Sequence, residues 1–419
     1  MPSQTQIADI GTGLDAPSRE AIEDVGFMTS MILVLLGNYA QTGHFGGPLA
    51  YTPSNVAVHL IGPGCGGLRY DYRRPKHPWA DRFLLAGGHC APTCYALWMI
   101  IGEALERRFR ATHERKYFAD PHTSLLPIDG LGFRRGADAL RTLLSDNGLT
   151  DHPLFAQAKM RGIKALAGHM ESVDLTSDVN GGPSGVGIAT AAGKAAFWDI
   201  AGAPIGSPKI IGFEGEFAMT EGHAQELKTQ AVALKTGKRL RILLSDNNAG
   251  IDDVLLGGVV PRQFTGYRLA DQWTSYGWNV FEIDDGGDYE KVIGAFRAME
   301  AWDESDRRPM ITIAKTTKGY WPASRDGKIP GFGNQLTGYK SHPYGLKMNC
   351  EYFVALAETF EKHYGVRFEG IRDGAVKNER DRLIQFKTNI DVVMSLLNRK
   401  GIGDWLAERV VGLGEELRE

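Results

Sequence analysis

Residues 210–253 constrain the fold of this 419-residue chain more than any other stretch. An apolar run at 209–213 enters a Gly-Glu turn at 215–216, and a helical pattern follows over 221–234. A second apolar run occupies 240–244 and ends in the polar sequence Ser-Asp-Asn-Asn. The order strand, turn, helix, strand is that of a βαβ unit, whose two strands lie parallel in one sheet. The chain is therefore expected to contain a parallel α/β sheet.

Acidic and amide side chains follow both predicted strands of this unit. Glu216 comes directly after the first strand, and Asn247 comes just after the second. Ligands of open α/β sheets bind at the carboxyl ends of the strands, where these side chains would meet. Oxygen ligands suit a hard cation such as Mg²⁺, which commonly joins a protein to a phosphate group. Because both residue types are also common in simple turns, the two positions predict either a metal-phosphate site or ordinary turns.

Strands and helices alternate in the same way along much of the chain. Residues 82–86 predict a strand, Gly87-Gly88-His89 a turn and 91–105 an apolar helix. Further strands are expected at 278–283 and 310–315, further helices at 18–39, 54–61, 137–147, 186–198 and 289–302, and a glycine-rich loop at 38–48. This alternation predicts an α/β fold, a three-layer sandwich with a mostly parallel sheet.

The expected domain organisation follows from where this alternation starts and stops. Residues 1–18 are polar with Gly and Pro, which indicates an N-terminal arm, and the α/β domain is expected to span 19–345. Residues 346–419 show helical patterns without strands and are expected to form a helical extension. One apolar face of this extension is expected to dock on this chain or on a partner, and it contains Phe353, Leu356, Ala357, Phe360 and Tyr364.

Charge and composition argue against several classes of protein. The formal net charge of −3 gives no electrostatic reason to expect nucleic acid or an anionic membrane as a partner. The longest apolar stretch is far too short to span a membrane, and no secretory signal pattern is evident. Four cysteines in a chain of this length do not make a disulfide framework. A cytoplasmic enzyme with a small-molecule substrate is the expectation that remains.

Eight short motifs occur between about residues 20 and 345. They read GHFGGP at 43–48, PWADRFLLAGGHCAPTCYAL at 78–97, GHME at 168–171, GGPSGVG at 181–187, GEFAMTEG at 215–222, SDNNAGID at 245–252, KTTKG at 315–319 and SHP at 341–343. In this order they resemble the N-terminal, diphosphate-binding half of transketolase. Each motif is weak by itself, whereas their shared order over most of the chain is specific.

The resemblance implies a thiamine diphosphate cofactor held through a divalent metal, which is Mg²⁺ or alternatively Ca²⁺ or Mn²⁺. By position, it implies metal ligation by the side chains of Glu216 and Asn247 and by the backbone carbonyl of Ala249. The implied cofactor-binding residues are His89, Gly182, Gly215, Glu216, Phe217, Asn247 and His342. The implied catalytic residues are His44, His169 and His342.

Two positions of the central motif depart from the family pattern. Glu216 stands where the family has the metal-ligating Asp, and it still offers carboxylate oxygens while reaching one methylene further. Phe217 stands where the family has Gly. A third departure is Phe45, which follows His44 in place of Pro.

The resemblance also implies that this chain is one half of an active site. In the family, the cofactor lies between this domain and a pyrimidine-binding domain that supplies the catalytic glutamate. Residues 351–419 are too few and too helical to form that second domain. The expected protein is thus the α-type subunit of a transketolase-like transferase, a hetero-oligomer with a separate pyrimidine-binding subunit. It would move a two-carbon ketol unit from a ketose to an aldehyde.

Two alternatives stay open at this point. One is a thiamine-diphosphate-dependent 2-oxo acid decarboxylase or dehydrogenase component, with which the Gly-Glu turn and the sequence KTTKGY at 315–320 are also compatible. The other is a non-catalytic structural or regulatory subunit, and Phe217 is the residue that favours it.

Overall fold

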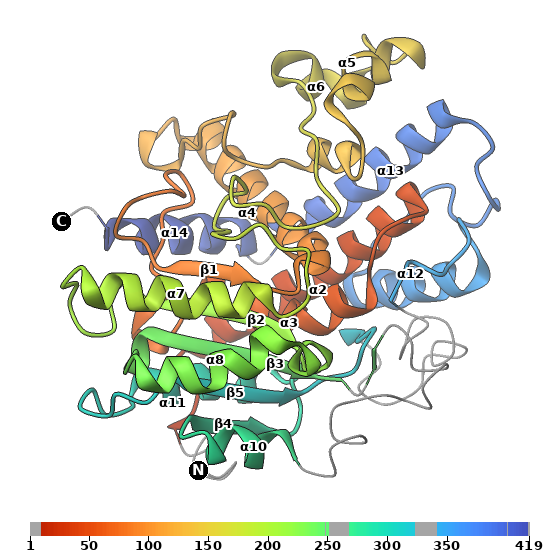
Figure 1. Cartoon of the computed structure of the whole chain (residues 1–419). Helices are drawn as coiled ribbons and strands as arrows, with labels where there is room; N and C mark the ends of the chain where they lie inside the picture. The colour runs from red at the N-terminus through yellow and green to blue at the C-terminus, as the bar shows by residue number, and fades with distance from the viewer. Residues whose placement is uncertain (1–9, 248, 251–267, 323–341, 400, 418–419) are drawn as a thin grey trace.

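A five-stranded parallel sheet organises the molecule (Figure 1). The computed structural model describes residues 10–247, 249–250, 268–322, 342–399 and 401–417. Within these residues the strand order is β1-β2-β3-β5-β4, and each neighbouring pair is parallel. The strands are β1 (Arg82–Leu85), β2 (Ile210–Gly215), β3 (Leu240–Asp246), β4 (Asn279–Ile283) and β5 (Met310–Lys315). The expected parallel α/β sheet is thus confirmed.

Both faces of the sheet are apolar because helices cover both of them. In β1, Phe83 and Leu85 join one core cluster, whereas Leu84 between them joins the other. Side chains alternate between the two faces of a strand, so a run that is apolar at every position is buried on both sides. This produces three layers, as the sequence predicts, with the sheet in the middle.

The helices divide between the two faces of the sheet. One face carries α7 (Val186–Ile200), α8 (Gly222–Ala233) and α10 (Leu269–Ser275). The other carries α2 (Ala16–Ala40), α3 (Gly46–Leu60), α4 (Ala91–Thr112) and α11 (Tyr289–Glu300). The remaining α-helices are α5 (Ala137–Asp146), α6 (Ala156–Arg161), α12 (Glu351–Tyr364), α13 (Glu379–Met394) and α14 (Ile402–Glu415).

The helical C-terminal extension packs on this chain. Helices α12 and α13 pack against α2, and α14 packs against α4. Phe353, Leu356 and Phe360 of α12 are completely buried and belong to the same core cluster as the sheet residue Phe213. The apolar face predicted for this extension therefore completes the core of the α/β domain.

The sequence interpretation was wrong about residues 46–53. They are the first half of α3, which begins at Gly46, whereas a loop to residue 48 and a helix from residue 54 were expected. Every residue of α3 is buried, so tertiary packing outweighs the poor helix propensity of its glycines and of Pro53. A Cβ atom on Gly47 would lie 2.7 Å from Cys90 Sγ, and only glycine permits this close approach.

The first long helix starts slightly earlier than expected. Helix α2 begins at Ala16 with Asp15 as its N-cap, inside the predicted arm, and residues 1–9 of that arm lie outside the described part of the chain. Among the described helices, none is both long and apolar enough to cross a membrane.

Candidate functional site

A cavity of about 320 Å³ lies at the carboxyl ends of the strands. Loops after β1, β2, β3 and β5 contribute to its lining, together with the loops before α3 and α7. The lining residues are His44, Gly47, Tyr51, Ala86, Gly87, His89, His169, Gly182, Ser184, Glu214, Gly215, Glu216, Phe217, Ala218, Asn247, Ala249, Gly250, Lys318 and His342. All ten residues singled out from the sequence are among them, so the structure brings the whole predicted set together.

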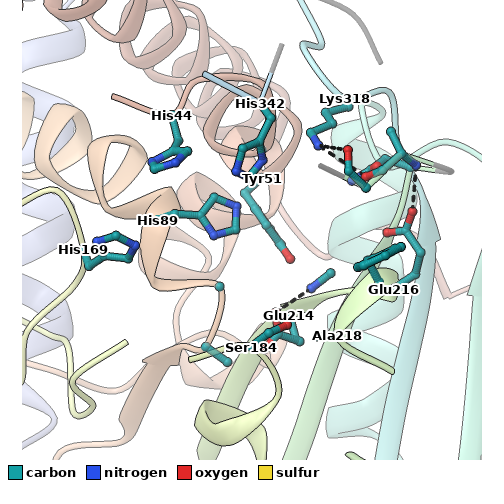
Figure 2. Close-up of a pocket in the computed structure, with 18 of the residues that line it drawn as sticks. His44, Tyr51, His89, His169, Ser184, Glu214, Glu216, Ala218, Lys318 and His342 are labelled. Carbon is teal, nitrogen blue, oxygen red and sulfur yellow. Dashed lines mark hydrogen bonds between the residues drawn. The ribbon is translucent and has the colours of Figure 1, made fainter. Parts of the chain in front are cut away.

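Four histidines form one wall of the cavity (Figure 2). The ring centroid of His44 lies 4.7 Å from that of His342, 5.4 Å from that of His89 and 5.9 Å from that of His169. These residues come from four separate segments of the chain, and His89 and His342 are also close, at 5.2 Å. The sequence predicted each histidine separately, whereas their mutual contact is a property of the fold.

Burial keeps three of these imidazoles neutral. It lowers the pKa of His44 to about 4, with His169, Arg134 and Lys318 adding to the effect. The pKa of His342 falls to about 3, again mainly because of burial, and the pKa of His89 also lies well below its usual range. A neutral imidazole has one nitrogen that accepts hydrogen bonds and one that donates them. In His44, Nδ1 is buried and has no hydrogen-bond partner within the described protein.

Backbone contacts between loops hold the histidine wall together. The Met170 amide donates to the Gly88 carbonyl (2.9 Å), and the Gly181 amide donates to the Met170 carbonyl (2.8 Å). A Cβ atom on Gly88 would lie 2.5 Å from the backbone of Gly181. The two segments can therefore approach this closely only because both contact positions are glycine. His89 and His169 are neighbours of these residues, and the glycine contact thus sets where both rings lie.

The segment that carries His342 is attached in a similar way. His44 and Pro343 form an antiparallel bridge, and the Tyr344 amide donates to the Gly43 carbonyl at 2.8 Å. These contacts place His342 beside His44, although 342 − 44 = 298 positions separate them in the sequence. Ser341 of the predicted motif lies outside the described residues.

The opposite wall of the cavity presents oxygen atoms (Figure 2). Glu216, directly after β2, is 1% exposed, and its Oε1 accepts a hydrogen bond from the Ala249 amide at 3.1 Å. Burial, reinforced by the nearby Asp246, raises the pKa of Glu216 to about 7. Asn247 Oδ1 is buried and has no hydrogen-bond partner within the described protein. A buried oxygen without a partner is costly, so this atom fits a site that a ligand completes.

These oxygens are suitable ligands for a hard cation. A carboxylate, an amide oxygen and a backbone carbonyl are the ligand types that Mg²⁺ and Ca²⁺ accept. Within the described residues, no three His, Cys, Asp or Glu side chains are grouped so as to hold a metal. Besides the carboxylate, a cation here would therefore be coordinated by amide and carbonyl oxygens of the protein and by oxygens of a bound phosphate group. Mg²⁺ is commonly coordinated in this way.

Nine of the lining residues were not predicted from the sequence, and three of these nine carry a titratable side chain. Tyr51 and Glu214 are buried, and among the residues that the structure describes the Tyr51 hydroxyl and the Glu214 Oε2 have no hydrogen-bond partner. Burial raises the pKa of Glu214 to about 7. The third residue is Lys318, which is 5% exposed. Lys318 follows β5 and Glu214 lies at the end of β2, so their places at strand ends could have identified both, whereas Tyr51 lies within α3 and carries no such signal.

Comparison with known families decides the relationship of this chain to other proteins. Residues 145–354, about half of the chain, match the family model described as "Transketolase, thiamine diphosphate binding domain". The chain belongs to the transketolase family. Eight of the ten predicted site residues lie within the matched range, and His44 and His89 precede it.

Relatives in this transketolase family differ in length from this chain. It is 30% identical to the transketolase of Halalkalibacterium halodurans over 307 residues, which make up 71% of this chain and 36% of that enzyme. It is 25% identical to one subunit of the apulose-4-phosphate transketolase of Phocaeicola vulgatus over 285 residues, which make up 67% of this chain and 76% of that subunit. The chain therefore spans well under half of the first relative and about three quarters of the second.

Solved transketolase structures show the same fold. The transketolase from Leishmania mexicana aligns over 94% of this chain and 48% of its own, with a TM-score of 0.56 and 20% sequence identity. This similarity agrees with the parallel sheet and its flanking helices. Together with the family match, it establishes that the cavity lies in a thiamine-diphosphate-binding domain.

Proposed function

We propose that this chain is the α-type subunit of a transketolase-like enzyme that depends on thiamine diphosphate and Mg²⁺. It would transfer a two-carbon ketol unit from a ketose to an aldehyde, with the catalytic glutamate supplied by a separate pyrimidine-binding subunit. The observation that carries the proposal is the cavity itself, in which an oxygen-lined wall faces a wall of four histidines. The chain also covers most of a relative that is itself one subunit of a transketolase, which supports the split organisation.

The oxygen-lined wall would hold the metal and the diphosphate. Glu216, Asn247 and the carbonyl of Ala249 would ligate Mg²⁺, which neutralises phosphate charge. His89 and His342 would donate hydrogen bonds to the diphosphate from the facing wall, and Gly182 would lie near the aminopyrimidine ring. Gly215 and Phe217 flank Glu216 and would shape this part of the site. When bound, the cofactor supplies carbanion stabilisation.

The remaining histidines would act on the substrate. His44 is neutral at pH 7 because its pKa is about 4, and its Nδ1, which has no partner in the described part of the chain, can hold or accept the proton of a substrate hydroxyl. His169 lies on the other side of His44 from His342 and would orient a second hydroxyl, while His342 would serve both the diphosphate and the substrate. The neutral imidazoles of His44 and His342 suit this role, since each can both accept and donate a hydrogen bond.

Calorimetry with thiamine diphosphate and Mg²⁺ tests the proposal, first on this chain alone and then with a candidate partner encoded next to it. Binding is expected in at least the paired sample, and ketose consumption in the presence of an aldehyde is expected there as well. Consumption of 2-oxo acids instead of ketoses would favour the decarboxylase alternative. Absence of cofactor binding in both samples would leave the non-catalytic alternative.

The metal ligand assignment makes a first prediction about Glu216. Glu216→Ala should weaken binding of thiamine diphosphate with Mg²⁺ by about tenfold or more, because the carboxylate is the charged ligand of the proposed site. Glu226→Ala is the matched control, since Glu226 is an exposed carboxylate on the helix of the same βαβ unit. Equal affinity of Glu216→Ala and the wild type would show that Glu216 is not a ligand.

A further inference from the structure

Two polar side chains at the floor of the cavity have no hydrogen-bond partner for one of their oxygens among the described residues. The floor is lined by Tyr51, Gly87, Ser184 and Glu214, and it adjoins the histidine wall and the oxygen-lined wall (Figure 2). The two atoms are Glu214 Oε2 and the Tyr51 hydroxyl oxygen, and each side chain belongs to a residue that is only 3% exposed. Leaving buried polar atoms unpaired costs free energy, so the floor fits a site that a polar group of a ligand completes.

Backbone contacts hold the Glu214 carboxyl group in place. Glu214 lies near the end of β2, and its Oε1 accepts a hydrogen bond from the Gly215 amide at 3.0 Å. Burial raises the pKa of this carboxyl to about 7, and hydrogen bonds from the backbone of Gly215 and of Gly185 lower it in part. The carboxyl is thus held between the end of β2 and the loop before α7, and Oε2 is the oxygen that a ligand can reach.

The Tyr51 hydroxyl borders the same space as the Glu214 carboxyl. A Cβ atom on Gly87 would lie 3.5 Å from Glu214 Oε1 and 3.9 Å from the Tyr51 hydroxyl oxygen. A Cβ atom on Gly215 would also lie 3.9 Å from this hydroxyl oxygen. The tyrosine ring stacks on that of Phe213 in β2, with centroids 6.0 Å apart, and Figure 2 shows its hydroxyl pointing toward Glu214. A small polar group above Gly87 would therefore lie near both side chains.

The chemistry of these two oxygens favours a ligand group that donates hydrogen bonds. An ionised carboxyl group only accepts hydrogen bonds, and a tyrosine hydroxyl can accept one as well. Phosphate oxygens are also acceptors, and a phosphate beside the Glu214 carboxylate would bring two anionic groups together in a buried place, which is costly. The donor is therefore expected in a part of the ligand other than its phosphates.

Thiamine diphosphate carries such a donor in one place. Apart from its phosphate groups, its N–H bonds are those of the amino group on the aminopyrimidine ring, whereas the thiazolium ring has neither an N–H nor an O–H bond. The amino group has two N–H bonds, and the floor presents two oxygens that can accept them, Glu214 Oε2 and the Tyr51 hydroxyl oxygen. The donors of this group thus match the acceptors of the floor.

We propose that Glu214 and Tyr51 bind the amino group of the cofactor's aminopyrimidine ring, so that this chain recognises the ring as well as the diphosphate. The inference rests on the proposed function, because it takes thiamine diphosphate to be the ligand of the cavity. Glu214 Oε2 and the Tyr51 hydroxyl oxygen each accept one N–H of the amino group. The chain would thereby distinguish the cofactor from other molecules that carry a diphosphate.

Calorimetry with thiamine diphosphate and with oxythiamine diphosphate, which has an oxo group in place of the amino group, tests this contact. The full chain is used with Mg²⁺, and with its partner chain where binding requires it, at about pH 8, where a carboxyl with a pKa of about 7 is mainly ionised. Glu214→Gln should reduce the preference for thiamine diphosphate over oxythiamine diphosphate about tenfold, because the glutamine amide can donate to the oxo group. Glu226→Gln is the matched control, since Glu226 is exposed on α8, and it should keep the full preference.

Inorganic diphosphate and thermal unfolding separate this role from a structural one. Glu214→Gln should bind inorganic diphosphate with Mg²⁺ at least as tightly as the wild type does, because this ligand has no ring. Tyr51→Phe should bind thiamine diphosphate several-fold more weakly, while its Tm without ligand should not fall, since the hydroxyl that it lacks has no partner in the described part of the chain. A hydroxyl that only supports the fold would instead lower the Tm when it is removed.

The outcomes separate this inference from the proposed function. An unchanged preference in Glu214→Gln would overturn the inference, as would a loss of inorganic diphosphate binding in the same variant. If the wild type binds thiamine diphosphate with Mg²⁺ in either case, the proposed function stands. If the wild type, with or without a partner chain, fails to bind thiamine diphosphate and Mg²⁺, the proposed function fails first.

Discussion

His59 links helix α3 to the loop that leads to the site. It is completely buried, with Nδ1 lying 2.8 Å from the Asn55 carbonyl and Nε2 lying 2.8 Å from the Thr176 hydroxyl. Thr176 lies between His169 and Gly182, so this contact supports the segment that carries both. Burial lowers the pKa of His59 to about 4, which keeps the imidazole neutral in the folded chain.

This low pKa predicts a pH-dependent stability. Between about pH 6.5 and pH 4 the unfolded chain binds a proton at His59 that the folded chain does not, so stability falls as the pH is lowered through this window. The neutral imidazole contributes up to about 3 kcal/mol to the free energy of unfolding relative to low pH, and this contribution is fully present above about pH 6.5. His59→Gln should remove this part of the pH dependence, although the smaller side chain also lowers stability at neutral pH.

Denaturant unfolding of the wild type and His59→Gln at about pH 7.5 and about pH 4.5 measures the effect. Other titrating groups are common to both proteins, so the difference between the two pH dependences reports on His59. Parallel stability curves for the two proteins would show that His59 does not titrate in this window.

The turn after β1 and the loop before α7 are held together by two glycines. Gly88→Ala would place a Cβ atom 2.5 Å from the backbone of Gly181, and backbone cannot move aside as a flexible side chain can. The variant should lose about 1–3 kcal/mol of stability and also bind thiamine diphosphate more weakly, because the shift displaces His89 and His169.

Gly193→Ala provides the control for this glycine substitution. Gly193 is exposed in the middle of α7, and a Cβ atom there would meet nothing within 4 Å. This variant should be more stable by about 0.5–1 kcal/mol, because alanine favours a helix. Thermal unfolding and cofactor calorimetry compare the two variants, and unchanged cofactor affinity in Gly88→Ala would contradict the role of the glycine contact.

The C-terminal helices and the α/β layers share one hydrophobic core. We propose that residues 346–419 fold together with the domain at 19–345 and not as an independent unit. A chain truncated after residue 345 would expose the apolar faces of α2 and α4 that α12, α13 and α14 cover. It should aggregate or unfold without a cooperative transition, since exposed apolar patches of this kind drive association.

Size-exclusion chromatography and thermal unfolding of the truncated chain test this arrangement. A monomeric fragment with a cooperative transition near that of the full chain would show that the extension is dispensable for the core. The same fragment would then also be a simpler protein for the binding experiments.

Much of the architecture could be predicted from the sequence. Short apolar runs identified all five described strands, and β5 matched the predicted bounds 310–315. Such runs are reliable because strands buried on both faces must be apolar throughout. Helix α3 was predicted only in part. Its glycines and its proline have poor helix propensity, and the stability of the helix comes from packing on every side.

The sequence by itself determined the layered parallel sheet, the family resemblance and the ten residues of the predicted site, because each depends on patterns that are local in the chain. Tertiary structure alone decided which of these residues touch and what their surroundings do to their charge. The contact of Gly88 with Gly181 and that of His44 with His342 join segments far apart in sequence. Distances of that kind depend on the packing of whole elements, and no local pattern encodes them.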